Sequence, residues 1–289
     1  MKIIVRYLKT LIVLITSGVM LLSCESATDS DSDDGETSNL LVLLSDAPFP
    51  ADTVAEAIVV IDSMDIRAKG DGEGDGPFIT LSRERGAYDL MDLRNGVTAS
   101  LVDLDVPVGR YDLVRLFVDS AYIFLKEDET SYPLRVPGGS SAGFKVFIRP
   151  EIEVISGITS ELLIDIDVSK SLLVQRVGQS PNTELRFTFK PVIRAVNYSS
   201  TGRITGEVKD TSSTPVLIRD AQVSVYQDTL ITSTFTDTTG AYALIGLEAG
   251  SYSMIAYATG YDSLEIENVE VVAATETPQD FVLTPVPEE

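Results

Sequence analysis

From residue 40 onward, short apolar runs alternate with polar positions at a period of two, and Gly, Pro, Asp and Asn interrupt them. Side chains of a β-strand alternate between two faces, so this period predicts strands; no long segment repeats at the 3.6-residue period of a helix. The pattern predicts an antiparallel β-sandwich over residues 40–198. The expected strands are 40–44, 57–67, 78–81, 111–119, 121–125, 144–148, 161–166 and 185–190.

Two of these segments also predict which side chains are buried. Alternation in segment 57–67 places five residues on one face: Ile58, Val60, Asp62, Met64 and Ile66. Segment 111–119 is apolar on both faces, since Leu113 and Phe117 alternate with Val114 and Leu116. A strand that is apolar on both faces is typical of the centre of a sheet, so we expect 111–119 to be a central strand.

A second, shorter β pattern covers residues 202–285, with apolar runs 202–208, 221–226, 231–244 and 251–266 that each end at turn residues. Gly240 and Gly250 are expected to supply turn conformations that side chains resist. Tyr242 and Tyr252, which follow these glycines, are expected to be core or corner residues with their hydroxyls tied to turns. The pattern predicts a second β-sandwich.

The first 24 residues have the order of a secretory signal peptide. Lys2, Arg6 and Lys9 precede an apolar run over residues 11–22, and the segment closes on Ser23 and Cys24. A small residue before a cysteine resembles the lipobox of bacterial lipoproteins, which implies cleavage after residue 23 and acyl chains, palmitate among them, on Cys24. The apolar run is shorter than the roughly 20 residues of a transmembrane helix. An uncleaved membrane anchor and an ordinary secretory signal remain as alternatives.

Residues 24–39 are expected to form an acidic, flexible tether. The stretch 25–39 has no large apolar residue and many like charges, so it cannot bury a core. A solvated spacer is the simplest interpretation. The alternative is that the run 29–34 resembles the acidic export signals of surface lipoproteins in Gram-negative bacteria. We therefore expect a lipid-anchored protein of the cell envelope, on the outer membrane, with its orientation left open.

Composition excludes several classes of function. The chain has 44 acidic and 22 basic side chains and a formal net charge of −22, which repels nucleic acid and anionic headgroups. It has no histidine, which excludes His-ligated zinc and histidine-based triads. With Cys24 as the single cysteine, neither an intramolecular disulfide nor a multi-cysteine metal site can form. No cofactor is expected.

One loop resembles part of a calcium-binding site. Asp71, Glu73 and Asp75 alternate with glycines, as in the first half of a calcium loop. Ser82 stands where the final bidentate carboxylate is required, and Pro77 interrupts the loop. A hairpin loop is the expected structure, and these three acids remain a weak calcium candidate.

Other polar groups predict structure more than catalysis. Asp165 and Asp167 are two apart on a strand and are expected to form a salt bridge with Lys170 or Arg176, or a turn cap. Ser169, Lys170 and Ser171 are adjacent on what is expected to be an extended chain, which points successive side chains to opposite faces. A glycosidase needs two carboxylates about 5–10 Å apart, but with 44 acids such pairs arise by chance. We expect no enzyme activity.

Five ordered motifs make the first block resemble the bacterial domain of unknown function numbered 4382. The motifs are Leu44-Ser45-Asp46-Ala47-Pro48; Tyr88-Asp89-Leu90 with Asn95-Gly96; Val108-Gly109-Arg110-Tyr111 with Arg115-Leu116; Asp165-Ile166-Asp167-Val168-Ser169-Lys170-Ser171; and Phe189-Lys190-Pro191-Val192-Ile193. The resemblance implies an envelope or secreted protein, often a lipoprotein, and no assigned reaction.

The second block resembles the carboxypeptidase regulatory-like domain, an immunoglobulin-like sandwich of the transthyretin (prealbumin) type. The matching residues are Gly206, Val208, Ala221, Val223, Val225, Thr236-Asp237, Gly240, Tyr242, Leu247, Gly250, Tyr252 and Gly260-Tyr261. The approach over residues 213–220 is slightly longer than usual. The resemblance implies a spacer, a folding aid or a sugar-binding-like sandwich without peptidase machinery.

Two functions from different classes remain. The first is a non-catalytic surface protein for binding, adhesion or scaffolding, which would use strand edges or flat faces. The second is a carbohydrate-binding module, which needs convergent polar groups and an aromatic floor built from Tyr or Phe, because the chain has no Trp. The expected partners are a membrane, through the lipid, and a glycan or protein ligand. Assembly by strand addition would need an uncharged exposed edge.

Overall fold

The computed structural model describes residues 36–47, 54–70, 75–126, 130–138, 140–177 and 184–287. The predicted signal peptide, Cys24 and most of the predicted tether lie outside these ranges. Contacts group Gly35–Glu289 into one compact unit. Within the described ranges, no helix is both long and apolar enough to cross a membrane.

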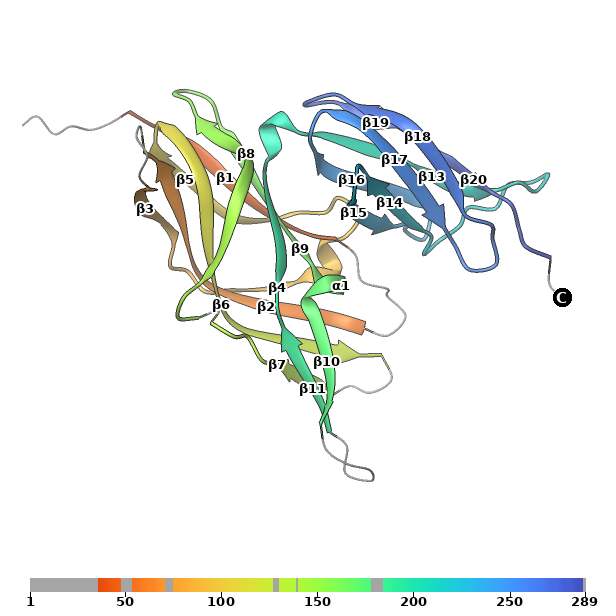
Figure 1. Cartoon of the computed structure of the whole chain (residues 1–289), viewed down its shortest axis with the longest axis horizontal. Helices are drawn as coiled ribbons and strands as arrows, with labels where there is room; N and C mark the ends of the chain where they lie inside the picture. Colours follow the sequence, from red (N-terminus) through yellow and green to blue (C-terminus); the bar gives the residue numbers. More distant parts are fainter. Residues whose placement is uncertain are drawn as a thin grey trace, which may run out of the picture. The chain divides into compact units, whose positions relative to one another are not determined.

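The described residues between 37 and 200 fold mostly as strands (Figure 1). The strands are β1 (Thr37–Ala47), β2 (Val54–Lys69), β3 (Asp75–Ser82), β4 (Gly86–Asp89), β5 (Ala99–Pro107), β6 (Gly109–Leu125), β7 (Ser131–Leu134), β8 (Phe144–Val154), β9 (Ser160–Asp167), β10 (Leu172–Val177), β11 (Glu184–Phe189) and β12 (Val192–Asn197). Short helical turns accompany them: η1 (Leu90–Leu93), α1 (Val168–Ser171) and η2 (Tyr198–Ser200).

One continuous sheet organises this part, with the strand order β3-β2-β6-β8-β12-β9-β1-β5. β4 pairs with β2, β7 pairs with β6, and β10 and β11 form a separate ribbon. The all-β fold class predicted from the period-two pattern is confirmed. The sheet is not purely antiparallel, because β1 runs parallel to β9 and β12 runs parallel to β8.

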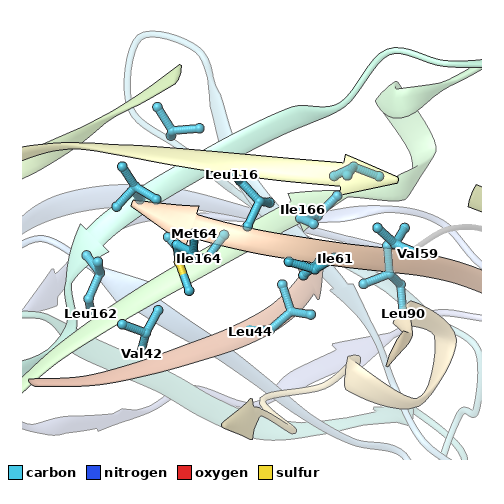
Figure 2. Close-up of a cluster of buried hydrophobic side chains, with 14 of the residues drawn as sticks. Val42, Leu44, Val59, Ile61, Met64, Leu90, Leu116, Leu162, Ile164 and Ile166 are labelled. Carbon is cyan, nitrogen blue, oxygen red and sulfur yellow. The ribbon is translucent and has the colours of Figure 1, made fainter. Parts of the chain in front are cut away.

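The sheet folds over a single hydrophobic core. Figure 2 shows Leu44 of β1, Ile61 of β2, Leu116 of β6 and Ile164 of β9 converging on one interior, with Leu90 of η1 beside them. All five side chains are at most 5% exposed. At about 25 cal/mol per Å² of apolar surface removed from water, this burial is the main stabilising contribution.

A β-bulge changes the buried face along β2, which corrects the prediction for segment 57–67. The core side chains are Val59 and Ile61 before the bulge and Met64 and Ile66 after it. The pairing with β6 shifts between Ile61 and Ser63, and the extra residue reverses the alternation. Strict alternation therefore identified the core face only for the second half of the strand.

The central strand β6 is longer than predicted. Segments 111–119 and 121–125 were expected to be separate strands, but both belong to β6. Its pairing with β2 shifts at Asp119, a bulge that bends the strand without ending it. The prediction that 111–119 is a central strand is confirmed, because β6 lies between β2 and β8.

Some elements were absent from the prediction. β4, β5, β7, β10 and β12 were not expected, because β4 and β7 are four residues long and β5 alternates Asp103 and Asp105 with its apolar residues. β1 also starts at Thr37, three residues inside the predicted tether, because 37–39 pair with β5. Cross-strand pairing decides these boundaries, and composition does not show it.

Residues 202–283 form two further sheets, as expected for the second block. The strands are β13 (Gly202–Asp210), β14 (Gln222–Tyr226), β15 (Leu230–Phe235), β16 (Ala241–Leu247), β17 (Gly250–Tyr257), β18 (Leu264–Val271), β19 (Glu276–Pro278) and β20 (Phe281–Leu283). One sheet has the order β16-β13-β19, with β20 also on β13, and the other has β15-β14-β17-β18. Val208, Val223, Met254 and Phe281 are fully buried in the core between them.

The second block covers one outer surface of the first. Leu163 of β9 and Val196 of β12 pack against Ile245 of β16 in a small apolar cluster. The side chain of Asn95 accepts a hydrogen bond from Ala243 N and donates to Ala241 O, at 2.5 and 3.3 Å, so it occupies the edge of β16. The second block therefore covers part of the outer surface of β9 and β12.

Candidate functional site

The outer surface of strands β3, β2, β6 and β8 carries aromatic and charged side chains together. Arg67 of β2 lies opposite Phe78 of β3 and Leu113 of β6, and Leu113 lies opposite Phe147 of β8. Directly opposed residues point to the same side of a sheet. We call this surface the Phe–Arg face, which consists of Asp65, Arg67, Phe78, Asp112, Arg115, Phe117, Lys145 and Phe147.

Two ion pairs hold the arginines of the Phe–Arg face in place. Arg67 donates from Nε and Nη2 to the two carboxylate oxygens of Asp112, at 2.9 and 2.8 Å. Arg115 donates from the same two nitrogens to Oδ2 of Asp65, at 3.1 and 2.5 Å. Paired contacts of this kind fix the plane of a guanidinium group as well as its position. The Arg67 side chain is 9% exposed, so solvent screens its pair weakly.

Phenylalanine rings lie next to these guanidinium groups. Cζ of Arg115 is 4.1 Å from the ring centre of Phe78 and 5.2 Å from that of Phe117. Phe78 is 37% exposed and Phe147 is 55% exposed, which is unusual for residues that normally enter a core. The face therefore offers apolar ring surface beside the partly exposed guanidinium group of Arg115, a combination of apolar and polar groups found in ligand sites.

Strand β8 adds two cations to this surface. Lys145, Phe147 and Arg149 are exposed and alternate with the buried residues Val146 and Ile148. Cζ of Arg149 lies 6.0 Å from the ring centre of Phe147. Among the described residues, neither Lys145 nor Arg149 has a carboxylate within ion-pair distance. Both charges are therefore available to a ligand.

A groove runs along β8. Its volume is about 500 Å³, and Lys145, Phe147 and Arg149 line one side of it. Gln227, Glu248 and Tyr252 are among the residues of the second block that line it. The volume lies within the range of small-molecule sites, roughly 300–1,000 Å³.

A second polar cluster lies where parallel strands β1 and β9 end. Ser45 pairs with Asp165 in the register of the two strands, and its Oγ donates to Oδ1 of Asp165 at 3.2 Å. Asp46 Oδ1 accepts a hydrogen bond from the Val168 N–H at 3.1 Å. Nη2 of Arg194 donates to Oδ2 of Asp165 at 2.8 Å. These hydrogen bonds hold the ends of β1, β9 and β12 together.

Asp46 is an incompletely bonded acid within that cluster. It is 6% exposed, and its Oδ2 atom has no hydrogen-bond partner among the described residues. Burial raises the pKa of the Asp46 carboxyl well above its usual value, the Val168 N–H lowers it, and the charges of Asp165 and Asp167 raise it further. A carboxyl in this environment favours its neutral form.

Replacing Asp46 with asparagine should therefore change stability in a pH-dependent way. The raised pKa means that the contribution of Asp46 is fully present below its unfolded pKa, near 4, and is lost as pH rises through the folded pKa. The asparagine side chain keeps an acceptor for the Val168 N–H and never ionises. We expect Asp46→Asn to match the wild type near pH 4 and to be more stable at pH 8, by roughly 1–3 kcal/mol.

Thermal unfolding of both proteins between pH 4 and pH 8 measures this difference. Asp105→Asn is the matched control, because it makes the same chemical change at an exposed position on β5. A melting-temperature difference for Asp46→Asn that is the same at every pH would contradict the assignment.

The structure assigns structural roles to the acidic pair predicted on β9. Asp167 caps α1: its Oδ1 accepts from the Lys170 N–H at 3.0 Å, and its Oδ2 lies 2.7 Å from Lys170 Nζ. The predicted pairing of Asp167 with Lys170 is confirmed. Asp165 instead pairs with Arg194, a residue that the prediction did not include. The side chain of Arg176 lies outside the described set.

The segment 169–171 is not extended, which corrects the expectation for it. It lies in the helical turn α1. Ser171 is buried; its Oγ donates to Asp167 O and accepts from the Val192 N–H. These bonds use Ser171 to join α1 to β12.

The other predicted site residues are only partly described. Cys24, Asp71 and Glu73 lie outside the described residues, and of Asp75 only the backbone is described, as the first residue of β3. In the portion of the chain that the structure describes, no three His, Cys, Asp or Glu side chains are grouped closely enough to hold a metal ion. The calcium candidate stays a prediction.

The tyrosine predictions for the second block are confirmed. Tyr242 and Tyr252 are 2% and 4% exposed. The Tyr242 hydroxyl donates to Gln279 O, and the Tyr252 hydroxyl donates to Glu248 O at 2.8 Å. Burial raises the pKa of both hydroxyls. Both tyrosines therefore belong to the fold.

The two glycine predictions differ in outcome. Gly240 has a φ of +75°, as expected for a turn that side chains resist. Gly250 does not have a positive φ; it begins β17, and the prediction of a special turn conformation there is wrong. Gly246, which was not singled out, has a φ of +67°, and a Cβ there would come within 2.8 Å of Leu163 Cδ2. Contact with the first block is therefore one reason why position 246 is a glycine.

Sequence reasoning did not find the Phe–Arg face. The alternation of Lys145, Phe147 and Arg149 is visible in the sequence, but the same pattern fits a strand whose phenylalanine is buried. The partners of Arg67 and Arg115 come from positions 45 and 50 residues away. Only the pairing of β2, β6 and β8 brings them together.

Two protein families match the chain. Residues 37–191, more than half of the chain, match the family described as "Domain of unknown function (DUF4382)". Residues 203–284 match the family described as "Carboxypeptidase regulatory-like domain". A search of curated proteins found no match.

Solved structures give weak similarities. A putative carbohydrate binding protein from Bacteroides uniformis is 19% identical, covers 29% of this chain and 41% of its own length, and has a TM-score of 0.26. The shaft pilin SpaA from Lactobacillus rhamnosus GG is 10% identical over 88% of this chain and 99% of its own, with a TM-score of 0.29. Scores this low transfer neither a ligand nor an assembly to this chain.

The family matches agree with the described structure, in which residues 37–200 and 202–283 each surround their own hydrophobic core. The chain belongs to the DUF4382 family, a domain of unknown function, and carries a carboxypeptidase regulatory-like domain after it.

Proposed function

We propose that the chain is a non-catalytic, lipid-anchored binding protein of the cell envelope, and that it holds a glycan on the Phe–Arg face. One observation carries this proposal: Phe78 and Phe147 are exposed beside two guanidinium groups that ion pairs hold in place. A sugar has apolar ring faces and a rim of hydroxyl oxygens. The rings of the face suit the first, and the partly exposed guanidinium group of Arg115, whose side chain is 27% exposed, suits the second.

The chemistry of the face supports binding without catalysis. Its two aspartates, Asp65 and Asp112, both accept hydrogen bonds from arginines that hold them in ion pairs. A glycosidase needs one carboxylic acid that donates a proton and a second carboxylate that attacks or activates water. Both carboxylates of the face are engaged by guanidinium groups, an arrangement that suits a structural role.

Three strand edges argue against a ligand that is a peptide strand. Edge strand β5 carries the exposed residues Asp103 and Asp105, and edge strand β18 carries Glu265, Glu267 and Glu270. Charged edges discourage the addition of another strand. Asn95 already occupies the edge of β16. These edges do not suit recognition by strand addition, whereas the Phe–Arg face remains exposed.

We expect Phe147→Ala to weaken glycan binding about tenfold, because an aromatic ring contributes about 0.5–1.5 kcal/mol beyond the apolar area that it buries. The wild-type lipoprotein is first screened on a glycan array, and the affinity of each variant for the best ligand is then measured by titration. Tyr257→Ala is the matched control, since Tyr257 is 53% exposed on β17, outside the Phe–Arg face.

Equal losses of glycan affinity for Phe147→Ala and Tyr257→Ala would show that the Phe–Arg face is not the binding site. An array without selective, saturable binding would reject the glycan function. In that case, a protein partner from the envelope is tested in place of the glycan. If this partner binds Phe147→Ala more weakly than the wild type but binds Tyr257→Ala normally, the scaffold or adhesion function replaces the glycan function.

A further inference from the structure

The first half of strand β8 carries two cations and no acid, in contrast to the acidic protein as a whole, and its acids Glu151 and Glu153 lie in the second half. The chain carries 44 acidic and 22 basic side chains, a net charge of −22. The other basic residues near the centre of the Phe–Arg face are matched by acids: Arg67 by Asp112 and Arg115 by Asp65. Lys145 and Arg149 differ, because neither has an ion-pair partner among the described residues.

These two cations lie on either side of an exposed ring. Lys145, Phe147 and Arg149 are two residues apart from one another on β8, so they point to the same side of the sheet. A strand rises about 3.3 Å per residue, which separates the Cα atoms of Lys145 and Arg149 by about 13 Å. A sugar ring on Phe147 would therefore have a positive charge near each end.

We infer that the groove along β8 binds an anionic glycan, whose sugar ring lies on Phe147 and whose carboxylate or sulfate groups bind Lys145 and Arg149. This inference rests on the proposed glycan-binding function and specifies its ligand. The groove of about 500 Å³ places all three residues along one wall. Arginine and lysine both bind such anions, arginine in a paired geometry and lysine as a point charge.

The rest of the surface limits this attraction to short range. At physiological salt the Debye length is about 8 Å, so acids beyond that distance act weakly on a bound anion. Glu248 lines the same groove, is exposed and would repel the ligand. Its removal should strengthen binding, whereas removal of the two cations should weaken it.

An acidic peptide suits the groove less well than a glycan. β8 pairs with β6 on one side, and on the other side Ile148, next to Phe147, pairs with Ala195 of β12. A peptide strand could not add along this edge without displacing that contact, so recognition by side chains is favoured there. A ligand with flat ring faces and dispersed negative charges fits that requirement.

Binding of three matched probes to the full-length lipoprotein tests the inference. The probes are a uronic acid oligosaccharide, its methyl ester, which has the same sugars without the charge, and a sulfated oligosaccharide. We expect the methyl ester to bind at least fivefold more weakly than the acid. The sulfated probe shows whether the site accepts sulfate as well as carboxylate, and selective binding of either anionic probe supports the inference.

Four variants assign the effect to residues. Lys145→Gln and Arg149→Gln should each lower affinity for the acid about fivefold, the range of a solvent-exposed ion pair. Glu248→Gln should raise it by two- to fivefold. Lys190→Gln removes an exposed cation from outside the groove and should leave it unchanged. All four positions are exposed, so these variants should fold normally.

The outcomes separate this inference from the proposed function. If the acid and the methyl ester bind equally well and Phe147→Ala still weakens both, the anionic specificity is wrong and glycan binding stands. If no probe binds and no glycan on the array is bound selectively, both the anionic specificity and the glycan-binding function are wrong. If Lys145→Gln and Lys190→Gln weaken binding equally, the effect belongs to net charge and the site on β8 is rejected.

Discussion

Replacing Arg194 with methionine is expected to lower the free energy of unfolding by about 3 kcal/mol, because it leaves a buried carboxylate without its cation. Asp165, its partner, has a side chain that is 8% exposed. Arg194 also donates from Nη1 to Gly246 O at 2.5 Å and from Nη2 to Ile245 O at 3.3 Å. One side chain therefore joins β9 and β12 to β16 of the regulatory-like domain.

The melting temperature measures this loss. At this size, 1 kcal/mol shifts a melting temperature by about 2–4 °C, so a decrease near 10 °C is expected. The double variant Asp165→Asn with Arg194→Met should recover part of the loss, since no buried charge remains unpaired. Lys145→Met makes the same change of charge at an exposed position and is the control. An Arg194→Met protein with the same melting temperature as the wild type would show that the contacts of Arg194 add no stability.

Cys24→Ala is expected to remove the protein from the membrane fraction almost completely. If Cys24 carries the lipid, it supplies the whole anchor, because it is the single cysteine and the net charge of −22 opposes binding to anionic headgroups. Each buried CH₂ of an acyl chain contributes about 0.8 kcal/mol, and stable anchoring takes more than one chain. Without the cysteine none of this contribution is available.

Sedimentation of membranes, followed by detergent phase partition, measures retention, and intact mass identifies the first residue and its lipid. Thr28→Ala, four residues beyond the cysteine, is the control and should behave as wild type. A wild-type mass that includes residues 1–23, or that shows an unmodified Cys24, would contradict the lipoprotein proposal.

The period-two pattern was sufficient for the fold class and for many strands. It predicted β2, β6, β8 and β9 because each alternates over several residues and buries at least one face. It did not predict the bulge near Ser63, because an extra residue leaves no mark on hydrophobicity until a partner strand is present. The predicted core face of β2 was therefore correct on one side of the bulge and wrong on the other.

The candidate site depends on the pairing of strands that lie far apart in the sequence. The sequence marked Asp165 and Asp167 as structural, and that interpretation agrees with the cap on α1 and the pair with Arg194. Gly246 shows the limit of local reasoning, since its φ of +67° and its contact with Leu163 come from another part of the chain.

By itself, the sequence determined the all-β class, the two family resemblances and the absence of histidine chemistry, since these depend on composition and on local period. The tertiary structure alone decided that Phe147 is exposed, that Arg67 and Arg115 are held by Asp112 and Asp65, and that Lys145 and Arg149 have no ion-pair partner among the described residues. The physical reason is that exposure and ion pairing depend on which strands become neighbours. That choice is made by register and by the docking of the second domain, which covers β9 and β12 and leaves Phe78 and Phe147 exposed on the sheet.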